Sequence, residues 1–172
     1  MKLSQRTARL GLSRTAAVMQ EARAMQQAGN DIIDFGPGEP DFPSPAVAGK
    51  AAVTAISRNF TRYTEVAGHP PLREAVALRL NRLYGCRLDS SNVIITNGAK
   101  QALFNLCMTL FEEGDEVLVP RPYWVTFPEA VRLAGAEPAF VDCPMEREFK
   151  PDVSSAEDAC SPSTRGVILN YP

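Results

Sequence analysis

The chain has 172 residues, of which 45% are hydrophobic and 22% are charged, and this composition is typical of a globular protein. Its net charge of −2 gives no electrostatic reason to expect nucleic acid or an anionic membrane surface as a partner, and no stretch approaches the ~20 consecutive apolar residues of a membrane-spanning helix. Four widely spaced cysteines and a single histidine predict neither a metal site nor a disulfide, and we expect a cytoplasmic protein because the N-terminus lacks the apolar core of a signal peptide.

The first half of the chain is predicted to be mainly helical. Apolar residues recur there at helical spacing, and Gly29 and Gly85 stand where two of the helices should end, since glycine readily adopts the left-handed conformation that closes a helix. One short β-branched run interrupts this pattern. The predicted helices cover residues 13–28, 45–58 and 71–84, and the predicted strand covers residues 32–35.

From residue 92 onward, strand patterns alternate with helix patterns. Such alternation predicts βαβ units and a mainly parallel sheet with flanking helices, hence an α/β fold. The segment 143–163 is more polar and is expected to hold a loop and a short helix. The predicted strands cover residues 92–96, 116–119, 138–141 and 164–170, and the predicted helices cover residues 100–111 and 123–133, the second ended by Gly135.

The segment 97–103 (NGAKQAL) carries the first functional signal. It follows the predicted strand 92–96 and opens a helix, so it places unpaired helical N–H groups beside a glycine. A helix start of this kind can hold a phosphate, although many αβ proteins turn in this way and bind nothing there. A dinucleotide site at Gly36-Pro37-Gly38 is excluded because residues 39–41 (EPD) neither supply the third glycine nor open a helix.

Three motifs in order extend this signal along the chain: residues 36–42 (GPGEPDF), 97–105 (NGAKQALFN) and 120–124 (PRPYW). Together they resemble the fold-type I pyridoxal-phosphate enzymes, specifically class I/II aminotransferases of the aspartate aminotransferase type. The resemblance implies the N-terminal part of that fold. Residues 1–45 would form an N-terminal arm and part of the small domain, and residues 46–172 an incomplete large domain that binds the cofactor.

The resemblance also implies a site for pyridoxal 5'-phosphate. Gly98, Ala99 and Lys100 match the phosphate-binding turn of the family, and the Lys100 side chain is either a counter-charge to the phosphate or an exposed lysine of the first helical turn. Trp124 is the only tryptophan. It matches the aromatic residue that stacks on the pyridine ring, although a lone tryptophan is otherwise more often a core residue.

Two further residues are implied by the same resemblance. Tyr63 matches a tyrosine that reaches the phosphate of the neighbouring subunit, which implies a homodimer; the alternative is a tyrosine that packs within its own loop. Gly38 matches a glycine whose backbone lies against the substrate carboxylate, and it would also serve as a turn glycine. Asn170 corresponds to the outer asparagine of a family motif and is given no catalytic role.

Catalysis itself is expected to lie outside these residues. None of the four lysines stands in the sequence context of the family's Schiff-base lysine, and the chain stops just before the position of the family's Asn-Pro-Thr-Gly motif. We therefore expect a fragment, inactive alone, of an enzyme that moves an amino group between an L-amino acid and a 2-oxo acid. The alternatives are another fold-type I enzyme (a C–S lyase or a synthase) and a non-catalytic remnant or dimer-forming module. The lysines are Lys2, Lys50, Lys100 and Lys150.

Overall fold

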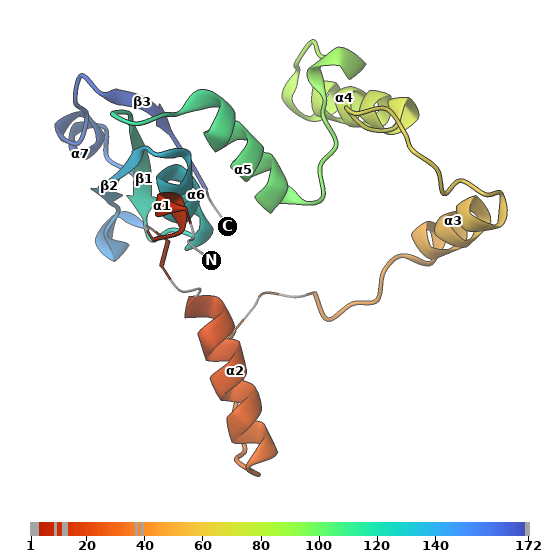
Figure 1. Cartoon of the computed structure of the whole chain (residues 1–172), viewed down its shortest axis with the longest axis horizontal. Coiled ribbons are helices and arrows are strands. Elements are labelled where there is room, and N and C mark those ends of the chain that lie inside the picture. The colour runs from red at the N-terminus through yellow and green to blue at the C-terminus, as the bar shows by residue number, and fades with distance from the viewer. Residues whose placement is uncertain (1–3, 9, 12–13, 37, 39, 171–172) are drawn as a thin grey trace. The chain divides into compact units, whose positions relative to one another are not determined.

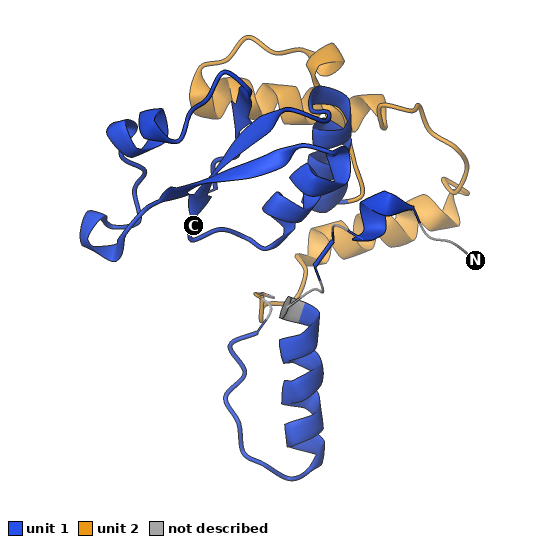
Figure 2. Ribbon diagram, turned by 60° about the vertical axis from the view of Figure 1, so that its left-hand side comes forward, with its two compact units in different colours: residues 1–37, 98–172 blue, residues 38–97 orange. Residues whose placement is uncertain are grey.

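The computed structural model describes residues 4–8, 10–11, 14–36, 38 and 40–170. The chain forms two compact units, one of residues 1–37 and 98–172 and the other of residues 38–97 (Figure 2). Each unit is described by itself below. The predicted boundary between residues 45 and 46, which separates arm from large domain, stays a prediction.

The first unit is built on a three-stranded parallel sheet (Figure 1). Strand β1 (Glu116–Arg121) lies in the centre, with β2 (Glu137–Asp142) on one side and β3 (Thr164–Val167) on the other. Glu116 pairs with Glu137 at one end of the β1–β2 ladder and Arg121 with Asp142 at the other. The prediction of an α/β fold with a parallel sheet is therefore confirmed.

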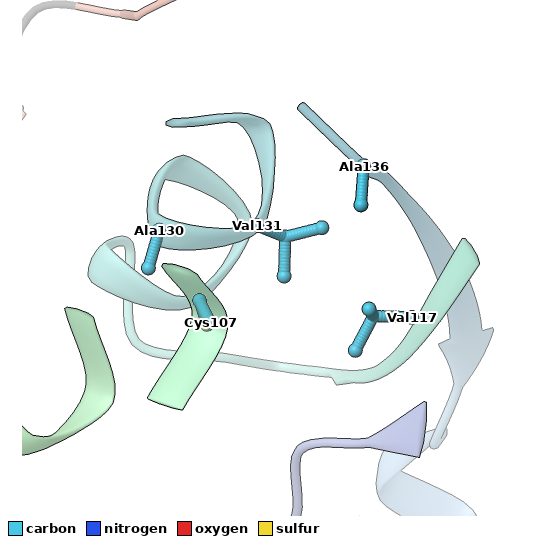
Figure 3. Close-up of a cluster of buried hydrophobic side chains, with 5 residues drawn as sticks. All are labelled: Cys107, Val117, Ala130, Val131 and Ala136. Atoms are coloured by element: carbon cyan, nitrogen blue, oxygen red, sulfur yellow. The ribbon is translucent and has the colours of Figure 1, made fainter. Parts of the chain in front are cut away.

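The core of this unit lies between β1 and two helices, α5 (Ala99–Leu110) and α6 (Thr126–Ala134). Val117 and Val119 of β1 are completely buried, as expected for a central parallel strand, which is covered on both faces. Figure 3 shows Val131 of α6 directed toward Val117 and Ala136. The buried cluster consists of Cys107, Val117, Ala130, Val131 and Ala136, and Leu103, Phe111, Ala134 and Ile168 pack against it.

Glycine ends α6 as the sequence predicts. Gly135 has a φ of 101°, and a Cβ atom there would lie 3.4 Å from the backbone nitrogen of Glu113. Both the left-handed conformation and the close approach favour glycine at this position. The start of α6 differs from the prediction, because the helix begins at Thr126 rather than at Tyr123. Trp124 therefore lies in the turn before α6 and not within the helix.

The remaining elements of the first unit are short, except for α2. The predicted helix at 13–28 is confirmed as α2, and the predicted short helix within 143–163 is confirmed as α7. The predicted strand at 32–35 is wrong: no ladder forms there within the described residues, and Ile33 and Phe35 are exposed. A β-branched run needs a partner strand before it can form a ladder. These elements are α1 (Gln5–Ala8), α2 (Arg14–Gln27), η2 (Met145–Arg147) and α7 (Val153–Asp158).

The second unit contains α3 (Ala46–Ser57), α4 (Pro70–Tyr84) and the short 3₁₀ helix η1 (Ser90–Asn92). Both α-helices were predicted within one residue at each end. Gly85 closes α4 with a φ of 67°, and its N–H donates to the carbonyl oxygen of Asn81.

The strand predicted at residues 92–96 is wrong. Asp89 accepts hydrogen bonds from Ser91, and the Asn92 side chain accepts one from the backbone N–H of Asp89, so this capping box draws residues 90–92 into a 3₁₀ turn. The chain then runs on from Val93 in an extended conformation without joining a ladder among the described residues. The capping box thus takes Asn92 out of the predicted strand, while Val93 keeps an extended backbone and the segment lacks a partner strand among the described residues.

Candidate functional site

The N-terminus of α5 is formed by the predicted phosphate-binding turn. Gly98 is the residue before the helix, with φ 83° and ψ 170°, a region that is essentially restricted to glycine. A Cβ atom at Gly98 would meet nothing within 4 Å, so the space beside the turn is open. No side chain of the described residues caps α5, and the first turn of a helix presents N–H groups and a partial positive charge. The turn therefore suits an anion.

Trp124 lies just beyond the carboxyl end of β1, where open parallel sheets bind ligands. The chain leaves β1 through a cis peptide bond between Arg121 and Pro122. The indole meets the ring of Phe127 edge-on, with 5.6 Å between the centroids and an interplanar angle of 89°. Because Trp124 is 38% exposed, part of its surface is available to a ligand while Phe127 supports the ring from α6. The stacking role of Trp124 stays a prediction.

The structure brings these two motifs together. The Lys100 ammonium nitrogen lies 5.0 Å from the centroid of the Trp124 ring, within the range of a cation–π interaction. Lys100 is in the first turn of α5, whereas Trp124 follows β1, 24 residues later. One place in the fold thus offers the first turn of a helix, the positive charge of Lys100 and a flat aromatic surface.

Aromatic and charged side chains support the segment that carries Trp124. The Tyr123 and Phe140 rings are stacked, with centroids 5.1 Å apart and an angle of 19°. The Arg121 guanidinium lies 4.9 Å from the Phe140 ring and forms an ion pair of 2.8 Å with Asp142. Sequence reasoning missed Phe127 and Phe140 as supporting residues. For Phe127, the available signal was its spacing of three residues from Trp124. The contacts of Phe140 with Tyr123 and Arg121 depend on the register of β1 and β2, which the sequence does not reveal.

Tyr63 and Gly38 belong to the other unit. Tyr63 lies in the connection between α3 and α4, with its side chain fully exposed, so it does not pack within its own loop. Gly38 is exposed, and a Cβ atom there would meet nothing within 4 Å. Its neighbours in the predicted motif, Pro37 and Glu39, lie outside the described residues. The roles of Tyr63 and Gly38 stay predictions.

The remaining reactive groups lie elsewhere. Cys107 is on the buried face of α5, where it packs as a small core residue, and burial raises the pKa of its thiol. Among residues 4–8, 10–11, 14–36, 38 and 40–170, His, Cys, Asp and Glu side chains form no group of three that could hold a metal ion. In this same part of the chain, no helix has the length and apolar character needed to cross a bilayer.

Comparison of the sequence with known proteins returns aminotransferases. The family model for aminotransferase class I and II matches residues 30–172. The aspartate aminotransferase of Geobacillus stearothermophilus is 40% identical over 172 residues, which are all of this chain and 44% of that protein. The aspartate/prephenate aminotransferase of Nitrosomonas europaea is 38% identical over 172 residues and is covered to 43%.

Solved structures give the same result. The aspartate aminotransferase of Thermus thermophilus with maleate superimposes with a TM-score of 0.95 at 38% identity, covering all of this chain and 45% of that one. The enzyme from Rhizobium meliloti gives a TM-score of 0.94 at 34% identity, with 43% of its length covered. The chain therefore spans less than half the length of the relatives it matches.

Proposed function

Because this chain belongs to the aminotransferase class I and II family, we propose that it forms part of a pyridoxal-phosphate-dependent aminotransferase. The observation that carries the proposal is the juxtaposition of Lys100 and Trp124 beside the N-terminus of α5. An anion site next to a partly exposed aromatic surface matches the two ends of the cofactor, a phosphate and a flat pyridine ring. Bound pyridoxal phosphate would supply an electron sink for negative charge at the substrate Cα.

The residues of the first unit would hold the cofactor at both of these ends. The backbone N–H groups of the turn at Gly98, Ala99 and Lys100 would donate to the phosphate, and the Lys100 ammonium would offset its charge. The exposed part of the Trp124 indole would pack against the pyridine ring. Such stacking is worth about 0.5–1.5 kcal/mol beyond the area that it buries. These groups bind and orient the cofactor, and none of them is assigned the transfer of a proton.

The second unit would contribute Tyr63 and Gly38. The exposed phenol of Tyr63 would donate a hydrogen bond to the phosphate held by a second subunit, so that each complete site needs a homodimer. The backbone at Gly38 would lie against the substrate carboxylate, since the open space beside this residue admits a ligand. We propose that none of the four lysines of this chain is the Schiff-base lysine of the family; they are Lys2, Lys50, Lys100 and Lys150.

The proposed substrates are an L-amino acid and a 2-oxo acid, as in amino acid metabolism. Aspartate is the first donor to assay and prephenate the first acceptor, because the names of the relatives in Geobacillus stearothermophilus and Nitrosomonas europaea include them. Two alternatives remain: another enzyme of the same fold, either a C–S lyase or a synthase, and a non-catalytic module. The names of these relatives favour the aminotransferase over both. We also propose a cytoplasmic location, which suits four free cysteines, two of them exposed, and which cell fractionation would test.

The test uses the product of the longest open reading frame that contains these 172 residues. The purified protein is expected to show the visible absorbance of bound pyridoxal phosphate, and to bind the cofactor more weakly when Trp124→Ala or Gly98→Val is introduced. It is then assayed with aspartate or aromatic amino acids as donors and prephenate as the acceptor, and separately with cystathionine. Rapid elimination from cystathionine without transamination would overturn the aminotransferase in favour of a lyase. Failure of the wild-type protein to bind the cofactor would favour the non-catalytic module.

A further inference from the structure

Arg73 of α4 reaches across the second unit and holds two backbone carbonyl groups that follow the helix. Its Nε atom donates to the carbonyl oxygen of Val93 at 2.9 Å, and its Nη2 atom donates to that of Ser90 at 2.6 Å. The side chain is only 14% exposed. A guanidinium has a rigid fork of donors, so it fixes both carbonyls in one geometry.

The same guanidinium also meets the loop that precedes α4. Its Nη1 atom lies 3.3 Å from a carboxylate oxygen of Glu65. Two residues further on, the carbonyl oxygen of Ala67 accepts a hydrogen bond of 2.9 Å from the N–H of Ile95. Arg73 therefore contacts both of the segments that this backbone hydrogen bond joins.

At Gly68 the loop 65–68 approaches the segment 93–95 closely. A Cβ atom on Gly68 would lie 2.6 Å from the Cβ of Ile95, and the φ of Gly68 is 102°. No other residue type fits here without moving one of the two segments. The loop 65–68 and the segment 93–95 thus form one packed body, with the Arg73 guanidinium bound to both of its parts.

We propose that Arg73 is a positioning residue for the cofactor site. It fixes the loop 65–68 against the segment 93–95 within the second unit, and these two segments adjoin Tyr63 and Gly98 along the chain. Tyr63 lies two residues before Glu65, and Gly98 three residues after Ile95. The expected effect of Arg73 on cofactor binding rests on the proposed function. The expected effect of Arg73 on the loop 65–68 and the segment 93–95 rests only on the contacts described above.

The first readout is amide hydrogen exchange, which does not depend on the cofactor. Loss of the guanidinium in Arg73→Met is expected to speed exchange at Ile95 and Gly68 by about tenfold or more, as the loss of a hydrogen bond to a charged group would. Amides in the middle of α4, such as that of Ala77, keep their protection. The matched control is Arg79→Met, which removes an exposed arginine from the same helix and is expected to leave Ile95 and Gly68 unchanged.

The second variant, Arg73→Lys, separates positioning from charge. A single ammonium group cannot bridge the carbonyls of Ser90 and Val93 as the fork does, so fast exchange is expected to persist. If lysine restores wild-type protection, the fork is not what holds the segment and the inference is overturned. Glu65→Gln is expected to change little, because Glu65 is largely exposed and such ion pairs contribute little. Should Arg73→Met fail to fold, Arg73→Lys carries the test.

The second readout is the affinity for pyridoxal phosphate of the product of the longest open reading frame. Arg73→Met is expected to weaken it about tenfold relative to Arg79→Met, in line with one lost hydrogen bond to a charged group. Faster exchange at Ile95 with unchanged affinity would overturn the positioning role. If the wild-type protein does not bind the cofactor at all, the proposed function fails, and the exchange data alone then support or overturn the lock between the two segments.

Discussion

Gly98 is the residue at which backbone conformation and proposed function coincide. Its φ of 83° and ψ of 170° lie in a region that other residues enter at a cost of about 1–3 kcal/mol. The space around its missing Cβ is open, so a substitution there acts through backbone strain rather than through collision. A position whose conformation favours glycine, at a helix start beside open space, suits a phosphate-binding turn.

Gly98→Ala is therefore expected to lower the free energy of unfolding by about 1–3 kcal/mol through backbone strain, measured by urea denaturation. Gly49→Ala is the matched control, because Gly49 lies inside α3 with nothing near its missing Cβ. There alanine should instead stabilise the protein by about 0.5–1 kcal/mol. If both variants stabilise the protein, Gly98 is not held in the strained region.

The contact between Lys100 and Trp124 makes a second prediction at this scale. A double-mutant cycle of Lys100→Met and Trp124→Leu is expected to give a coupling energy of about 0.5–1 kcal/mol in thermal or urea unfolding, as for other exposed cation–π pairs. Lys150→Met replaces Lys100→Met in the control cycle, since Lys150 pairs with Glu148 instead. Equal coupling in the two cycles would show that the ammonium of Lys100 does not act on the indole.

At the scale of single elements, the sequence predicts best what is decided locally. The ends of α4 and α6 follow from Gly85 and Gly135, whose left-handed conformations close each helix without help from distant residues. The strands predicted at 32–35 and 92–96 fail for the opposite reason, because a strand exists only with a partner. Asp89 supplies a local alternative for the second of them.

Asp89 also gives η1 a dependence on pH. Hydrogen bonds from the hydroxyl and backbone N–H groups of Ser91 lower the pKa of the Asp89 carboxyl, with a smaller contribution from Arg73. Since the pKa is lower in the folded protein, the stabilisation is present above the unfolded value of about 3.9 and is lost as the pH falls through the folded value.

The stability difference between wild type and Asp89→Ala should accordingly be largest near neutral pH and should disappear in acid. Urea unfolding at a series of pH values between 7 and the acid limit of folding measures it. Ser91→Ala removes the hydroxyl donor and is expected to flatten the wild-type profile. A difference that stays constant across the series would mean that the Asp89 carboxylate does not hold the turn.

At the scale of the whole molecule, the three sequence motifs predicted the family and proposed the residues of the candidate site. They did not predict that Lys100 and Trp124 lie in contact. Lys100 and Trp124 come together because the α5 turn and the end of β1 lie at the same edge of the unit, and spacing along the chain does not encode that distance. Tyr63 and Gly38 could be proposed only from the resemblance, since the role of Tyr63 depends on a second subunit and that of Gly38 on a bound substrate.

The exposed apolar surface of the 172-residue chain leads to the last prediction. Within the described part of the chain, β3 is an edge strand that pairs with β1 alone; Val167 and Leu169 beside this edge are exposed, as are Leu106 and Leu110 of α5. An unpaired strand edge next to apolar side chains promotes association. Residues 1–172 alone are therefore expected to self-associate, to bind the dye ANS and to show no visible absorbance with added pyridoxal phosphate.

The control for this prediction is Val167→Lys, which places a charge on the free edge of β3 and should reduce self-association in analytical ultracentrifugation, because charged residues protect strand edges. A lysine at the exposed Val153 of α7, on a helix rather than at the strand edge, should have a smaller effect. If residues 1–172 instead sediment as a monomer, unfold cooperatively and exclude the dye, the apolar faces of α5 and β3 do not require a covering surface. Cooperative unfolding at a temperature raised by the cofactor would further mean that this chain binds pyridoxal phosphate by itself.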